Sequence, residues 1–168
     1  FLSAMPLVTS KLKPLTCVAF RNDGKKLATS EYGHQASIFV WSIDTGVLAQ
    51  ELKSHSLGVS VMAFTPNNKL LISVGSEHDQ QLNIWDMRSP SPLRSCKITS
   101  KVRSMAVSED SSFFVTAGLR HLKIWSLELS SHTITCGSFK DHEFVDVACG
   151  KGDLHNFIYA VSREGVLF

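Results

Sequence analysis

Residues 55–86 read HSLGVSVMAFTPNNKLLISVGSEHDQQLNIWD and contain three short runs of apolar and β-branched residues. The runs cover residues 59–64, 70–74 and 82–85, with turn-forming residues after the first and a polar loop after the second. Apolar runs of this length, separated by such residues, are typical of strands that follow one another in an antiparallel meander. The stretch therefore predicts one small antiparallel sheet.

The same order of runs recurs on both sides of this stretch. The flanking runs cover residues 17–20, 27–29, 38–41, 105–107, 114–117 and 122–125. The third run of each copy ends at a tryptophan, and Trp85 follows Trp41 by 44 residues and precedes Trp125 by 40. A period of ~40 to 45 residues is that of a four-stranded propeller blade. We therefore predict an all-β chain built from repeated blades.

Several positions of the unit match a known family together. The first run ends at Phe64, which is followed by Thr65 and Pro66. Trp85 is followed by an aspartate, and Asp79 lies six residues before Trp85. With these motifs the chain resembles the WD40 family. The resemblance implies a WD40-type β-propeller that binds other proteins, and it implies no catalytic role and no cofactor.

Members of that family contain a buried chain of hydrogen-bonded side chains in each blade. The matching residues here are His55 before the first strand, Ser73 on the second, Asp79 in the turn, and Trp85. A buried indole N–H needs an acceptor, and each further polar group needs a partner in turn. We expect these four residues to form a structural tetrad.

The flanking blades depart from this pattern at the acidic position. Blade one keeps Thr29 and Trp41 but has Gln35 where the acid is expected. Blade three keeps Thr116 and Trp125 and has a shorter loop without an acid. We therefore expect the complete tetrad in the second blade only.

The period also sets the expected organisation of the chain. We predict about three complete blades plus partial blades at both ends, as in a piece of a longer protein, because an open blade exposes an apolar face. The predicted units are 1–13 (outer strand of a preceding blade and exit loop), 14–53, 54–98 and 99–138 (three blades), and 139–168 (an incomplete blade).

A closer resemblance rests on residues 108–118, 120–125 and 145–152, together with the loops around His34 and His78. These segments are similar to the mitogen-activated protein kinase-binding WD40 scaffolds. The resemblance implies partners among protein kinases or spindle-pole components, and a cytoplasmic location associated with the cytoskeleton or spindle pole. In that group the kinase-docking region lies largely outside the propellers.

The composition is that of a globular chain, with 43% apolar residues, 19% charged residues and a net charge of +2. No apolar run approaches the ~18 residues of a membrane span, so we expect no membrane association. The four cysteines have no C-x-x-C spacing and are interpreted as free buried thiols: Cys17, Cys96, Cys136 and Cys149. No common catalytic, nucleotide-binding or metal-binding motif is present, so we expect no small-molecule substrate and no metal.

One stretch of the chain is locally basic. Residues 87–108 contain no Asp or Glu. Five cations form this candidate basic patch: Arg88, Arg94, Lys97, Lys101 and Arg103. The alternative function that they suggest is charge-driven binding of a polyanion, such as nucleic acid or an acidic filament surface. Solvated edge strands explain the same residues, and the absence of aromatic residues between them argues against specific nucleic-acid binding.

The loops before each third strand should emerge on one rim of the propeller. Their aromatic, His, Arg and Glu side chains form a candidate partner-binding rim: Tyr32, His34, Glu77, His78, Arg120 and His121. Side chains of these types are common at the centres of protein interfaces. Turn geometry alone would also tolerate them, so both interpretations stay open at this point.

Overall fold

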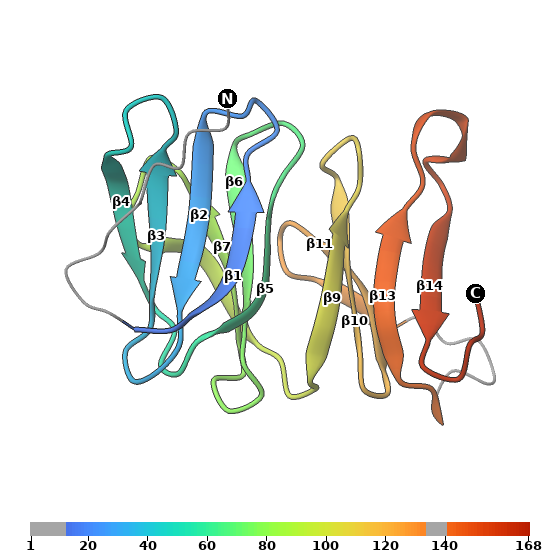
Figure 1. Cartoon of the computed structure of the whole chain (residues 1–168). Coiled ribbons are helices and arrows are strands. Elements are labelled where there is room, and N and C mark those ends of the chain that lie inside the picture. Colours follow the sequence, from blue (N-terminus) through green and yellow to red (C-terminus); the bar gives the residue numbers. More distant parts are fainter. Residues whose placement is uncertain (1–12, 134–140) are drawn as a thin grey trace, which may run out of the picture.

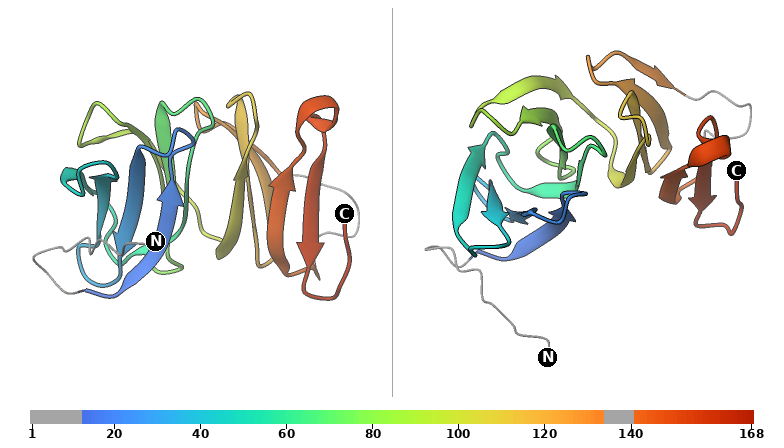
Figure 2. Two further views of the ribbon diagram at one scale, coloured as in Figure 1. Left: turned by 45° about the horizontal axis from the view of Figure 1, so that its top comes forward. Right: turned by 90° about the horizontal axis from the view of Figure 1, so that it is seen from above.

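The computed structural model describes residues 13–133 and 141–168, which form four antiparallel sheets side by side along an arc (Figure 1, Figure 2). The first sheet contains β1 (Leu15–Phe20), β2 (Lys26–Glu31), β3 (Ser37–Ser42) and β4 (Leu48–Lys53). The second contains β5 (Val59–Phe64), β6 (Leu70–Gly75), β7 (Gln81–Asp86) and β8 (Pro92–Lys97). The third contains β9 (Val102–Val107), β10 (Phe113–Gly118), β11 (His121–Ser126) and β12 (Ser131–Thr133).

The three four-stranded sheets share one topology and one register. In each, the strands are paired in the order in which they occur in the chain. The tryptophan of the third strand lies opposite the second residue of the second strand, as Trp85 does opposite Leu71 and Trp41 opposite Leu27. The predicted all-β fold of repeated meanders is confirmed. The expected outer strand within residues 1–13 lies almost entirely outside the described residues.

The sheets pack through their faces, with the first strands nearest one another: β1 lies against β5, β5 against β9, and β9 against β13. Between the first two sheets, Ile38 and Val40 pack with Trp85, which is fully buried. The next interface places Phe114 against the second sheet. Complete burial of side chains of this size contributes roughly 1.5–3 kcal/mol each, so these interfaces fix how neighbouring sheets are placed.

The turns that join the first two strands have equivalent geometry in all three sheets. Gly24, Asn68 and Ser111 have φ angles of 69°, 63° and 61°, in the left-handed region. Each donates its backbone N–H to the carbonyl three residues earlier, at 2.8–2.9 Å. Gly and Asn tolerate this conformation well, whereas Ser does so less readily. The turn is therefore part of the repeat even where the residue type differs.

The fourth sheet is two-stranded. It pairs β13 (Phe144–Cys149) with β14 (Ile158–Ser162), and a short 3-10 helix, η2 (Gly152–Leu154), lies between them. Val161 of β14 also forms an isolated bridge with Leu167, which follows that strand. Within the described residues, no helix has the length and apolar character needed to cross a membrane.

Candidate functional site

The second sheet holds the expected tetrad residues in one chain of hydrogen bonds. The Trp85 indole N–H donates to Ser73 Oγ at 2.8 Å, and Ser73 Oγ lies 2.8 Å from His55 Nε2. His55 Nδ1 lies 2.5 Å from Asp79 Oδ2. Because the indole can only donate, Ser73 accepts there and gives its own proton to Nε2, so that Nδ1–H donates to Asp79. Every proton in this buried chain has an acceptor.

Asp79 connects the tetrad to the loop before β5. Its Oδ1 accepts from the backbone N–H of Ser56 at 2.5 Å and from the Ser56 hydroxyl at 2.6 Å. Burial acts to raise the pKa of Asp79, but the hydrogen bonds from His55 and Ser56 outweigh it and hold the pKa below its usual value. A methyl group at Gly75 would overlap the Asp79 carboxylate. The glycine on β6 therefore leaves room for the acid.

Asn83 joins the same chain and was missed from the sequence. Its amide Nδ2 lies 3.2 Å from His55 Nε2, and its Oδ1 accepts from the Ser95 hydroxyl at 2.6 Å. Asn83 lies two residues before Trp85 on β7 and is fully buried. An amide in the middle of an apolar strand was the signal that would have found it, because a buried amide requires partners.

In the first sheet a different residue supplies the buried carboxylate. The Trp41 indole N–H donates to Thr29 Oγ1 at 2.9 Å, as in the second sheet. Gln35, at the expected acid position, is exposed. Glu31 lies two residues after Thr29, as Gly75 does after Ser73, and only 2% of it is exposed. A carboxylate thus enters this region from β2 instead of from the following loop.

Glu31 is paired with a lysine that precedes β1. Its Oε2 lies 3.6 Å from the ammonium of Lys13, while Oε1 has no hydrogen-bond partner. The same ammonium donates to the backbone carbonyl of His34 at 2.8 Å. Lys13 therefore links the chain before β1 to the loop between β2 and β3, much as His55 and Asp79 link the corresponding segments of the second sheet.

The third sheet contains a histidine at yet another position. The Trp125 indole N–H donates to Thr116 Oγ1 at 2.7 Å, and Thr116 Oγ1 lies 2.7 Å from His121 Nε2. The prediction that His121 lies on an exposed rim is wrong, because only 2% of it is exposed. The turn between β10 and β11 contains only Leu119 and Arg120, so that His121 already belongs to β11 and points into the blade.

The other five rim residues are exposed, at the lower edge of Figure 1, where second strands lead into third strands. They are Tyr32, His34, Glu77, His78 and Arg120. Backbone contacts hold the first and third of these loops against the next blade, and the second is linked to it by the Lys101–Glu77 salt bridge. Tyr32 forms a β-bridge with Gly58, and the Arg120 N–H donates to the His142 carbonyl at 3.2 Å.

Acidic side chains neutralise three of the five cations in the predicted basic patch. Arg88 pairs with Asp86 at 2.6 Å, Lys101 pairs with Glu77 at 3.1 Å, and Arg103 pairs with Glu143. The remaining two, Arg94 and Lys97, are exposed, and neither has a salt bridge to any residue in the described part of the chain. The patch of five free charges expected from the sequence is reduced to two on β8.

No cluster of three or more His, Cys, Asp or Glu side chains within 13–133 and 141–168 has an arrangement that could hold a metal ion. Cys17, Cys96 and Cys149 are free thiols that are half-buried, less than the full burial expected. Burial raises the pKa of each thiol. Cys136 lies outside the described residues.

The pairing of Lys13 with Glu31 predicts energetic coupling between them. Lys13→Met should lower the free energy of unfolding by about 1–3 kcal/mol, because it leaves a buried carboxylate without its cation. The loss should be smaller in a Glu31→Gln background. Urea unfolding of the single and double variants measures this, with Lys69→Met, in an exposed turn, as the matched control. Equal losses in both backgrounds would contradict the pairing.

Burial of His121 predicts a pH-dependent stability. Desolvation, helped by the charge of Lys123, lowers its pKa from 6.5 to about 4. A histidine whose folded pKa is depressed stabilises fully above its unfolded pKa, and the contribution, at most about 3 kcal/mol, is lost as the pH falls from about 6.5 toward 4. The stability difference between the wild type and His121→Gln should therefore shrink in urea unfolding between about pH 7 and 4.5. A constant difference would contradict the assignment.

A comparison with protein families finds the family described as "WD domain, G-beta repeat" at residues 46–86 and 91–126. Each match begins just before the outer strand of one sheet and ends one residue after the Trp of the next, so that it joins an outer strand to the three inner strands that follow it. The crystal structure of the Cps50 (Swd1) β-propeller domain of Myceliophteria thermophila superposes with a TM-score of 0.78 at 15% identity, covering 94% of this chain and 51% of that one. At this identity the likeness concerns the fold alone.

Two groups of curated relatives are similar over most of the chain. Mouse "Mitogen-activated protein kinase-binding protein 1" is 35% identical over 96% of this chain, and mouse "WD repeat-containing protein 62" is 36% identical over 92%. "Cilia- and flagella-associated protein 52" of Macaca fascicularis is 24% identical over 90%. The chain spans only 12%, 11% and 28% of these relatives. Together with the repeated sheets, these matches show that the chain belongs to the WD40-repeat family and has the β-propeller fold.

Proposed function

We propose that this chain is a non-catalytic platform for protein–protein interaction. The observation that carries the proposal is the rim at the ends of the second strands, where exposed side chains sit on loops that are held by the neighbouring blade. Tyr32 is 54% exposed and its backbone is bridged to Gly58, while Leu119 is 44% exposed and bridged to Glu143. Fixed loops lose little conformational entropy on binding, which favours recognition of a partner.

The partner class follows from the relatives and is the finer part of the proposal. One relative is named for binding a mitogen-activated protein kinase, and another for association with cilia and flagella. We propose that this chain contributes to stress-activated kinase signalling or to spindle-pole assemblies, in the cytoplasm and at the cytoskeleton. The likeness to the kinase-binding relative over 96% of the chain supports this.

Polyanion binding, the alternative function, is less well supported. Charge-driven binding to phosphates grows with the number of free cations that meet them. Three of the five cations in the basic stretch already contact carboxylates, at Asp86, Glu77 and Glu143. We therefore place protein partners ahead of nucleic acid.

A rim variant tests whether the propeller itself contacts the kinase, in addition to the docking region that the resemblance implies outside the propellers. A double variant, Tyr32→Ala with Arg120→Ala, should weaken binding to a purified stress-activated mitogen-activated protein kinase by at least about tenfold, because both side chains are exposed on the rim. Biolayer interferometry on the folded chain measures the affinity. Lys69→Ala, in a turn at the opposite end of the sheets, is the control. An unchanged affinity in the double variant, or an equal loss in the control, would contradict the rim as the binding surface.

A further inference from the structure

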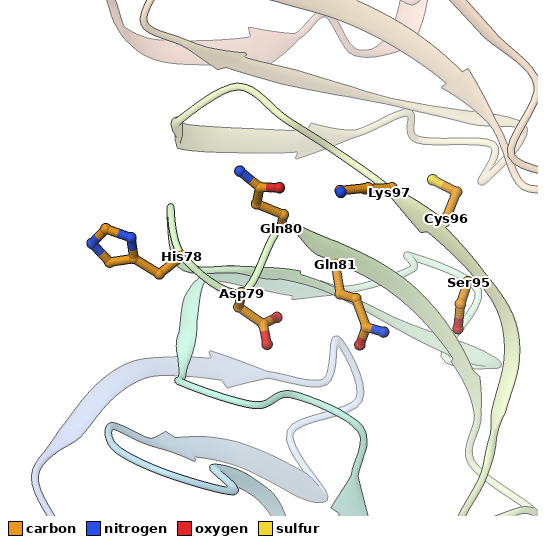
Figure 3. A pocket seen from close by; sticks show the side chains of 7 residues that line it. All are labelled: His78, Asp79, Gln80, Gln81, Ser95, Cys96 and Lys97. Carbon is orange, nitrogen blue, oxygen red and sulfur yellow. The ribbon is translucent and has the colours of Figure 1, made fainter.

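A hollow of about 510 Å³ lies on the second sheet where β7 begins and β8 ends. Figure 3 shows the residues that line it, which come from the loop before β7, from the first residue of β7 and from the last half of β8. They are His78, Asp79, Gln80, Gln81, Ser95, Cys96 and Lys97. The hydrogen bonds of the tetrad and of the rim loops leave this hollow open to solvent.

The hollow contains hydrogen-bond donors that have no acceptor among residues 13–133 and 141–168. Lys97 has no salt bridge in the described structure, and Figure 3 shows its side chain extending from β8 toward Gln80. Gln80 contributes an amide beside Lys97, whereas the Gln81 amide is directed away from both in Figure 3 and its Oε1 accepts from the Ser54 hydroxyl at 3.2 Å. An ammonium and a side-chain amide together suit a carboxylate or another anion.

No available negative charge competes for these donors. Asp79 is the one acid in the lining, and both of its oxygens already accept hydrogen bonds, from His55 and from Ser56. Figure 3 shows its carboxylate directed away from Gln80 and Lys97. Burial raises the pKa of the Cys96 thiol, so this group stays neutral and does not repel an anion. The hollow therefore lacks an internal counter-ion for Lys97.

The strand beside the hollow adds two further features. β8 is the outermost strand of its sheet, and among the described strands it pairs only with β7. It also exposes Arg94 and Leu93, of which Leu93 is 54% exposed. An extended segment can pair with an open strand edge and place alternate side chains against such residues. Arg94 and Lys97 would then draw the same segment by its negative charge.

We propose that the hollow and the edge of β8 bind an extended acidic segment of a partner protein, with one Asp or Glu side chain of that segment in the hollow. The recognising groups are the Lys97 ammonium and the amide of Gln80, and Arg94 lies along the same strand. This site rests on the proposed role as an interaction platform and names the chemistry of one partner. It shares His78 with the candidate rim but includes neither Tyr32 nor Arg120.

A blocked, fluorescein-labelled hexaglutamate peptide tests the site by fluorescence anisotropy at an ionic strength of about 50 mM, where surface charges are weakly screened. Lys97→Glu should weaken binding by at least about tenfold, and Lys97→Arg should retain it. Arg88→Glu is the matched control, because it makes the same change of charge at an exposed cation that already pairs with Asp86. The ¹⁵N side-chain amide signal of Gln80 should shift on titration in the wild type.

Each contrary result overturns the proposal in a recognisable way. An equal loss in Arg88→Glu would mean that net charge, not the hollow, attracts the peptide. Equal binding of hexathymidylate, with the same loss in Lys97→Glu, would make the site a general anion site and not one for an acidic protein segment. No binding of hexaglutamate, or no shift of the Gln80 amide, would also overturn it.

The kinase-binding proposal and the acidic-segment site can be contradicted independently of each other. The double variant of Tyr32 and Arg120 should keep its affinity for hexaglutamate, because both residues lie outside the hollow. If that variant binds hexaglutamate normally while kinase binding is absent in the wild type, the partner in the proposed function is wrong and the acidic-segment site stands.

Discussion

A buried indole N–H has to donate a hydrogen bond, and this requirement recurs in each of the three four-stranded sheets. The second strand meets it with a hydroxyl: Thr29 accepts from Trp41, Ser73 from Trp85, and Thr116 from Trp125, all at 2.7–2.9 Å. A hydroxyl that accepts still has a proton to place. The side chain that accepts this proton therefore determines which loop is hydrogen-bonded to the strands of each blade.

The three blades place that next group differently. Blade two uses His55 and Asp79, which reach the hydroxyl from the loops before the first and third strands. Blade three uses His121 from its own third strand, and His121 Nδ1 has no partner. Among the described residues of blade one, no further side chain forms a hydrogen bond with the Thr29 hydroxyl, and the buried Glu31 pairs with Lys13 instead. The packing between sheets is thus a shared feature of the repeat, whereas the polar links at the rim differ from blade to blade.

The strands were predictable because apolar runs with a fixed period dictate both their positions and their register. The second-blade tetrad followed from matching four positions of one copy. His121 was misplaced because its blade has a two-residue turn, which moves the histidine from a loop into a strand. Glu31 was not predicted because the pattern of the repeat places the acid in the loop before the third strand, where this chain has Gln35.

The surface was less predictable than the core, for a physical reason. The partners of Lys101 and Arg103 are Glu77 and Glu143, which lie far away in the sequence and come close only in the folded chain. A count of charges along residues 87–108 cannot detect such pairs. The hollow was not predictable for the same reason. Its lining residues come from the loop at His78 and from the end of β8, which are separated in the sequence.

Hydrogen exchange of the three indole N–H groups tests the central claim most directly. With ¹⁵N-labelled tryptophan, we predict three resolved indole signals, all strongly protected, because each N–H is buried and bonded to a hydroxyl of the second strand. Replacing Ser73 by Ala should speed exchange at Trp85 and leave the signal of Trp125 largely unchanged. Rapid exchange at any of the three tryptophans in the wild type would contradict the account, since the repeat would then not rest on these bonds.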